Sequence, residues 1–329
     1  MTAILREYLY VDLEKVRGLA SQLYEGVPET AERKDADGKK YQLGSSRLAY
    51  MAGERVNDVT EIKSLADALF PILESDLEAE GYLADISDIA ADGRQFASGE
   101  LKNAYPNGSL IRLTCDGRLM DPRYFAKVLA GFATAIVGFD GLSDQSTTAP
   151  SGGGRGRGQG RNQSEIKYPA GQNPEDMIPD IPNGSFSDID ARQMRSMVRV
   201  LRGMYPEGVS MSLEPAGVDG PTISIRLQEG RQYLEAEPET LFARYGLDMQ
   251  EWTVIGTIGH HAGSALENQA ADISFLEGDV VNRGKFTAFV NQMLGVMGIT
   301  GFLELPQAPG FSLVPVAVYR TIPRVAFVE

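Results

Sequence analysis

Residues 143–190 read SDQSTTAPSGGGRGRGQGRNQSEIKYPAGQNPEDMIPDIPNGSFSDID and divide the chain. The stretch is rich in Gly, Pro, Ser, Gln and Asn and holds almost no run of apolar residues. Such a segment cannot bury enough apolar surface to offset the entropy lost on ordering its backbone. Helix and strand patterns flank it. The sequence therefore predicts an α+β protein of two mixed α/β blocks, residues 1–142 and 188–329, joined by a flexible polar linker at 143–187.

Composition narrows the class of protein. The chain has 329 residues, and its 45 acidic against 31 basic side chains give a net charge of −14, which argues against duplex nucleic acid as a partner. Cys115 is the single cysteine, so no intramolecular disulfide can form, as is typical of a reducing compartment. No apolar run approaches the roughly 18 residues of a membrane helix. We expect a cytoplasmic protein without membrane contact.

The first block begins with a strand at 4–11, followed by a helix that Asp12 can cap. A long helix follows from about residue 59, and Pro71 within it should kink or split it. After a strand at 109–114, the pair Asp121-Pro122 signals the start of a further helix. The face predicted to be buried on that helix consists of Phe125, Val128, Leu129, Phe132 and Ile136.

The second block begins with a helix that ends near Met204, for which Ser187 and Asp190 form a capping pair. The predicted strands are residues 209–213, 222–227, 251–258 and 312–319, and the first two suggest a hairpin. A helix at about 286–297 precedes the last strand. We expect helices on one face of a mixed sheet. Pro315 should place the last strand at an edge, because proline cannot donate to a strand ladder.

Four arginines on the helix before Met204 form the most distinctive charge pattern. They recur at intervals of three, four and three residues and therefore align along one stripe of a helix: Arg192, Arg195, Arg199 and Arg202. Guanidinium groups in this arrangement suit a phosphate-rich ligand, a nucleotide or an acidic protein partner. The alternative is that the stripe pairs with the chain's own surplus carboxylates.

His260 and His261 are the only histidines, and they follow a strand pattern. Adjacent strand residues point to opposite faces, so the pair is unsuited to binding one metal ion. Either ring could act as a general base, oriented by Asp272 or Asp279. Cys115 could act as a nucleophile, although a small core residue is the simpler interpretation. We expect no metal and no cofactor.

Residues 152–161 read GGGRGRGQGR and resemble a short arginine–glycine segment. Arg155, Arg157 and Arg161 could bind RNA, or the segment could be a plain linker. The chain contains no GxxxxGK[ST] phosphate loop and no GxSxG nucleophile motif. These patterns give no positive sign of catalysis.

The opening of the chain resembles an uncharacterised bacterial family, a domain of unknown function. The matching residues are Tyr8, Tyr10, Asp12, Ser21, Gln22, Leu23 and Gly26. Residues 65–70, 252–256 and the closing VPVAVYR at 314–320 are similar as well. The resemblance implies a bacterial, cytoplasmic, two-part protein and carries no catalytic residues with it.

Together these observations favour a non-enzymatic bacterial cytoplasmic sensor or adaptor that binds an anionic small molecule or a protein partner. One alternative is a hydrolase or nucleotide-processing enzyme that uses His260 or His261. Another is RNA binding through the arginine–glycine segment.

Overall fold

The computed structural model describes residues 5–24, 59–144, 173–180, 190–227, 233–262, 276–277, 280–299 and 305–323. The predicted α+β class is confirmed. Two compact units make up the chain: Met1–Met120 with Gly208–Glu329, and Asp121–Glu207. Most of the expected linker, including Arg155, Arg157 and Arg161, lies outside the described residues.

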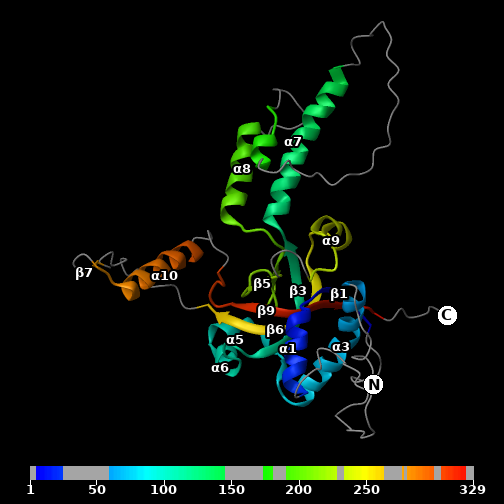
Figure 1. Cartoon of the computed structure of the whole chain (residues 1–329), viewed down its shortest axis with the longest axis vertical. Helices are drawn as coiled ribbons and strands as arrows, with labels where there is room; N and C mark the ends of the chain where they lie inside the picture. The colour runs from blue at the N-terminus through cyan, green and yellow to red at the C-terminus, as the bar shows by residue number, and fades with distance from the viewer. Residues whose placement is uncertain are drawn as a thin grey trace, which may run out of the picture. The chain divides into compact units, whose positions relative to one another are not determined.

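A seven-stranded sheet forms the first unit (Figure 1). Its strands are β1 (Arg6–Val11), β2 (Leu83–Asp85), β3 (Leu110–Met120), β4 (Ser210–Leu213), β5 (Ile223–Arg226), β6 (Gln250–His261) and β9 (Phe311–Thr321). Strands β3, β4, β5, β9 and β6 pair in that order, and β6 pairs back with β3, so they close into a ring. Strand β1 extends the sheet beside β9, and β2 extends it beside β3.

The ring joins residues from both expected blocks. Strand β3 of the first block pairs antiparallel with β4 and with β6 of the second. Strand β1 likewise pairs with β9, so that Tyr8 lies opposite Tyr319. The compact units therefore do not follow the expected division into 1–142 and 188–329. The local patterns predicted most strands, but their pairing depends on contacts far apart in sequence.

Strand β9 lies inside the sheet, so the prediction of an edge strand was wrong. One side of β9 pairs with β6, and the other pairs with β5 at residues 311–313 and with β1 at residues 317–321. Pro315 falls between these last two segments and beside a register shift opposite Gly256. At this position no neighbouring strand requires a hydrogen bond from the backbone N–H that Pro315 lacks. An interior strand can therefore accommodate the proline.

The main core fills one face of the closed sheet. Ile111, Leu113 and Leu119 lie at alternate positions of β3 and are buried together with Trp252 and Val254 of β6. Three short helices join this cluster: α4 (Ser87–Ala90), α5 (Gly93–Ala97) and α6 (Glu100–Ala104). Helix α9 (Pro238–Tyr245) contributes Leu241 and Tyr245. The sequence predicted a short helical or irregular piece where α9 lies, but α4, α5 and α6 were missed, because each is too short to show helical periodicity.

A second core lies beneath helices α1 (Leu13–Leu23) and α3 (Val59–Ala79). Asp12 caps α1 as predicted, since its carboxylate accepts a hydrogen bond from the Lys15 backbone N–H. Pro71 lies within a continuous α3, so the expected split does not occur. The flanking residues Phe70 and Leu73 are buried in this core, and their packing holds the helix on both sides of the proline.

The second unit contains α7 (Pro122–Asp144), the 3-10 helix η1 (Pro174–Met177) and α8 (Ala191–Met204). Helices α7 and α8 run antiparallel and side by side (Figure 1). Asp190 is itself the N-cap of α8, so the helix begins later than the predicted capping pair implied, and Ser187 lies outside the described residues. The core of this unit consists of Ala126, Ala130, Ala133, Ile136, Ile178, Ala191, Met194 and Val198.

The predicted buried face of α7 was wrong for three of its residues. Phe125, Val128 and Phe132 are exposed by 48%, 44% and 49%. Alanines face α8 instead, because their small side chains allow the two helices to approach closely. Ile136 is buried and Leu129 packs against this core, so the prediction holds for those two residues.

The remaining elements of the described chain are a small hairpin of β7 (Leu276–Glu277) and β8 (Val280–Val281), and α10 (Arg283–Ile299). Helix α10 matches the helix predicted at about 286–297. No helix in the described ranges has both the length and the apolar character needed to cross a membrane.

Glu74 of α3 binds three strands of the sheet. One carboxylate oxygen lies 2.6 Å from Arg6 Nη1 of β1, and the other accepts hydrogen bonds from Arg112 Nε of β3 at 2.9 Å and the Tyr319 hydroxyl of β9 at 3.1 Å. The Glu74 side chain is 2% exposed. Burial and the Glu74 carboxylate raise the pKa of the Tyr319 hydroxyl, which therefore stays protonated and donates to Glu74.

We predict that Glu74→Gln will lower the free energy of unfolding by about 3–5 kcal/mol, because the mostly buried Arg6 guanidinium loses its counter-charge and Arg112 keeps only the pairs with Glu78 and Asp85. Urea denaturation followed by circular dichroism measures this. Glu80→Gln is the matched control, because Glu80 is exposed just beyond the end of α3. Equal losses in the two variants would show that Glu74 does not anchor the helix.

Candidate functional site

The two histidines end β6 and point in opposite directions, as expected for neighbours on a strand. His260 is exposed, whereas His261 is 5% exposed. His261 Nε2 lies 2.7 Å from the Tyr105 carbonyl oxygen, and its backbone N–H donates to Asn107 Oδ1 at 3.1 Å. Since a carbonyl oxygen only accepts, Nε2 carries the proton and Nδ1 is left as an acceptor. Asp272 and Asp279, the candidate orienting residues, lie outside the described residues.

A cavity of about 200 Å³ lies beside His261. Its lining includes Phe96, Leu101 and His261, which are buried, and Lys102, Ala308 and Pro309, which are exposed at the rim. Phe96 stacks on Phe311 with ring centroids 6.1 Å apart, and the His261 ring centroid lies 5.2 Å from that of Phe311. The cavity therefore combines an aromatic floor, one imidazole and one ammonium group.

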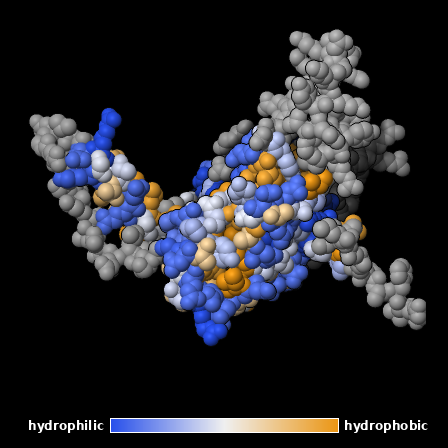
Figure 2. All heavy atoms as spheres, turned by 90° about the horizontal axis from the view of Figure 1, so that it is seen from below, coloured by the Kyte–Doolittle hydropathy of each residue, from blue (hydrophilic) through white to orange (hydrophobic). Residues whose placement is uncertain are grey.

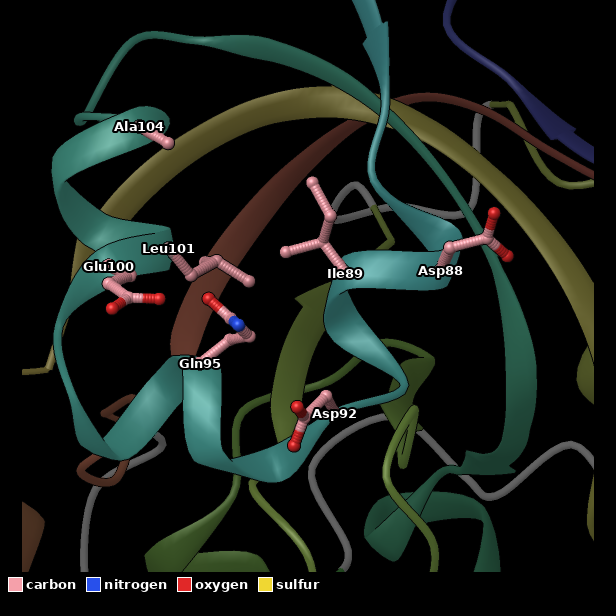
Figure 3. Close-up of a pocket in the computed structure, with 7 residues that line it drawn as sticks. All are labelled: Asp88, Ile89, Asp92, Gln95, Glu100, Leu101 and Ala104. Atoms are coloured by element: carbon pink, nitrogen blue, oxygen red, sulfur yellow. The ribbon is translucent and has the colours of Figure 1, made fainter.

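A wider hollow of about 530 Å³ lies among helices α4, α5 and α6, and it shares Leu101 with the smaller cavity. Figure 3 shows Ile89 and Leu101 pointing toward one another, with the Gln95 side chain below Leu101. Asp88, Asp92 and Glu100 also line it, and Arg94 binds the Asp92 carboxylate at 2.9 Å. In the described ranges, no cluster of three or more His, Cys, Asp or Glu residues is arranged to hold a metal ion. The hollow is open and acidic, and Arg94 pairs with one of its three carboxylates.

The arginine stripe of α8 faces the chain's own η1 segment. Arg195 donates to the Ile178 carbonyl at 2.8 Å and to the Asp180 carboxylate at 2.7 Å. Arg202 donates to Asn173 at 2.8 Å and pairs with Glu175, which is 2% exposed. These contacts match the alternative that the stripe pairs with the protein's own carboxylates.

The other two arginines of the stripe are less engaged. Arg199 lies 3.9 Å from Glu175 and is 61% exposed, and Arg192 is exposed as well. These two guanidinium groups are therefore the ones on α8 with the fewest bonds to the rest of the unit. The sequence analysis missed Glu175 and Asp180 as partners, although the acidic run around residues 175–180 was the signal that could have identified them.

A second exposed feature of the same unit is apolar. It consists of Phe125, Val128 and Phe132 on α7 with Met197 and Val200 on α8, and we call it the hairpin face. On the face seen in Figure 2, apolar side chains reach the surface in patches between hydrophilic ones. Helix α10 also exposes large apolar side chains: Phe286, Met293, Leu294, Val296 and Met297. Single exposed apolar residues are ordinary, but five on two adjacent helices form a candidate interaction surface.

Cys115 is partly buried on β3 beside two carboxylates. Burial, with smaller contributions from Asp116 and Glu251, raises the pKa of its thiol to about 12. A thiol with this pKa stays protonated at neutral pH and is a poor nucleophile. The geometry therefore favours a structural role for Cys115.

We predict that Cys115 will react with iodoacetamide at pH 8 about 10³ times more slowly in the folded protein than in urea. A pKa of about 12 leaves about 10⁻⁴ of the thiol ionised at pH 8, against about a quarter for an ordinary cysteine. Mass spectrometry of timed samples gives both rates. The control is a variant with an added, exposed thiol, Asn103→Cys. Equal labelling of the two thiols in the folded protein would contradict the raised pKa.

We also predict that Arg202→Ala will lower the free energy of unfolding by about 1.5–3 kcal/mol, because it leaves the buried Glu175 carboxylate without its closest cation. Arg192→Ala removes the same charge from an exposed position of the same helix and should change stability by less than about 0.5 kcal/mol. Urea denaturation compares the variants. If Arg192→Ala is as destabilising as Arg202→Ala, the pairing with η1 does not stabilise the unit.

Comparisons with known proteins place the chain in one family. The model of a domain of unknown function, DUF6414, matches residues 5–319. No curated protein and no solved structure matches the chain. The family match runs through both compact units, including the strands of the sheet and the helices α7 and α8. The chain therefore belongs to the DUF6414 family.

Proposed function

We propose that this chain is a non-enzymatic bacterial cytoplasmic adaptor that binds a protein partner through the hairpin face. The observation that carries the proposal is the exposure of Phe125 and Phe132 on a helix whose alanines pack inward. An aromatic side chain buries roughly 150–250 Å² when covered. Two half-exposed phenylalanines on one helix therefore provide a strong driving force for a partner to dock.

The helical positions support a single continuous surface. On α7, the exposed Val128 and Phe132 lie about a third of a turn from the alanines that face α8. On α8, Met197 and Val200 lie about a third of a turn from Met194 and Val198 in the corresponding direction. Because the helices run antiparallel, these displacements bring the exposed residues to the same side of the pair. Segment η1, with its partners Arg195 and Arg202, occupies the other side.

The same geometry indicates the chemistry of the partner. Arg192 and Arg199 lie on the exposed side of α8, next to Ser196 and Val200. A partner that covers Met197 and Val200 and extends across α8 would meet these two guanidinium groups. We therefore expect a partner with an apolar strip flanked by carboxylates, such as an amphipathic helix.

Two contacts favour an adaptor over the alternatives. Arg195 and Arg202 are bound by residues of η1, which leaves few donors on α8 for a small anionic ligand. The Nε2–H of His261 is bonded to a backbone carbonyl rather than to a carboxylate, which does not suit a general base oriented by an acid. Protein binding at the hairpin face needs neither group.

We predict that immobilised intact chain will retain a specific protein from the cytoplasm of its native bacterium, and that Phe132→Asp will abolish this retention. A charge at the centre of an apolar interface should weaken binding at least about 30-fold, the range of an interface hot spot. Quantitative mass spectrometry of the eluates is the measurement. Arg192→Glu with Arg199→Glu should weaken the same retention and reduce its dependence on salt.

Thr134→Asp is the matched control, because Thr134 is exposed on the opposite side of α7 and the substitution adds the same charge. Circular dichroism should show that all variants are folded. If the proteins retained are the same for the intact chain, Phe132→Asp and Thr134→Asp, or if none is retained, the hairpin face is not a docking surface and the proposal fails.

A further inference from the structure

We propose that the cavity beside His261 binds a small aromatic carboxylate that carries a hydroxyl group. This site lies in the first compact unit and is independent of the hairpin face. Three features of the cavity lead to this ligand: an unused acceptor on a buried ring, an aromatic and apolar lining, and one cation at the rim.

The acceptor is Nδ1 of His261. The bond from Nε2–H to the Tyr105 carbonyl fixes the tautomer, so Nδ1 presents a lone pair. Within the described part of the chain no donor bonds to Nδ1, although the side chain is only 5% exposed. The buried ring leaves this nitrogen little access to water, so a donor would stabilise it, and a ligand hydroxyl group can supply one.

The lining selects an apolar and flat ligand body. Phe96 and Leu101 form the buried side of the cavity, and the stacked pair Phe96–Phe311 supports it from behind. A benzene ring occupies an apolar cavity of about 150 Å³, so about 200 Å³ holds one ring with a small substituent. Aromatic rings pack favourably against Phe96 and against the proline at the rim.

The charge at the rim selects an anion. Lys102 is exposed at the mouth of the cavity and is the only charged side chain in its described lining. The carboxylates Asp88, Asp92 and Glu100 line the neighbouring hollow on the other side of Leu101, and they would repel an anion there. A ligand with its ring in the cavity, its hydroxyl at His261 and its carboxylate at Lys102 uses all three features.

The experiment compares three probes of one shape: 4-hydroxybenzoate, benzoate and 4-hydroxybenzyl alcohol. Ligand-detected NMR on the intact chain should give a dissociation constant of about 0.1–1 mM for 4-hydroxybenzoate, as is usual for a ligand of this size. Benzoate lacks the donor and should bind about 2–12-fold more weakly. The alcohol lacks the carboxylate and should bind about 2–5-fold more weakly.

Two variants at exposed positions test the location without disturbing the core. Ala308→Trp should fill the mouth of the cavity and abolish binding of all three probes. Lys102→Gln should weaken 4-hydroxybenzoate about 2–5-fold and leave the alcohol unchanged. Asn103→Asp, which lowers the net charge by the same amount on the same helix, is the control and should bind as the unmodified chain does.

The inference is overturned if 4-hydroxybenzoate does not bind at about 10 mM, or if benzoate binds as tightly as 4-hydroxybenzoate. It is equally overturned if Ala308→Trp binds the probes unchanged, since the ligand would then lie elsewhere. Partner retention by the hairpin face is measured on separate variants, so either proposal can fail without the other.

Discussion

The pairing of Met120 with Ser210 is the constraint on which the organisation of the chain depends. These residues flank the second unit, Asp121–Glu207, so that unit must return the chain to the point where it left the sheet. Two antiparallel helices meet this requirement, because the start of α7 lies beside the end of α8, where Arg123 donates to the Arg202 carbonyl at 3.2 Å. Once β3 and β4 pair, β5, β9 and β6 can close the ring. The sheet is thus the common framework of both halves of the sequence.

In this acidic protein, buried carboxylates are the bonding partners of several arginines. Glu74 binds Arg6 and Arg112, while Glu175 binds Arg202, so in each unit a nearly fully buried acid holds a helix or turn to its neighbours. A buried acid without a cation is costly, so each arginine is needed by the fold before it can serve a ligand. A net charge of −14 therefore coexists with few accessible cations on α8.

Contacts between residues close in sequence, such as helix caps, could be predicted from the sequence. Which distant element a side chain packs against or bonds to could not. The caps Asp12 and Asp190 follow from backbone donors a few residues away, so their signals are complete within the sequence. Helix α7 carries an apolar arc wider than one neighbour can cover, and periodicity cannot decide which half faces α8. The structure buries Ala130 and exposes Phe132. Likewise, the pattern identified His261, but only the fold shows that Tyr105 binds its ring.

Some side chains have strong bonding partners within the fold, and others leave apolar surface or a hydrogen-bond acceptor unused. Arg195, Arg202 and Glu74 have strong partners, and altering them should first affect stability. The hairpin face and Nδ1 of His261 differ, because the one exposes aromatic area and the other an acceptor that the described chain does not satisfy. Exposed aromatic area costs free energy in the isolated protein, and so does an acceptor with little access to water and no donor in the described chain. A partner at the first and a hydroxylated ligand at the second would each recover that cost, so function is best sought at these two places.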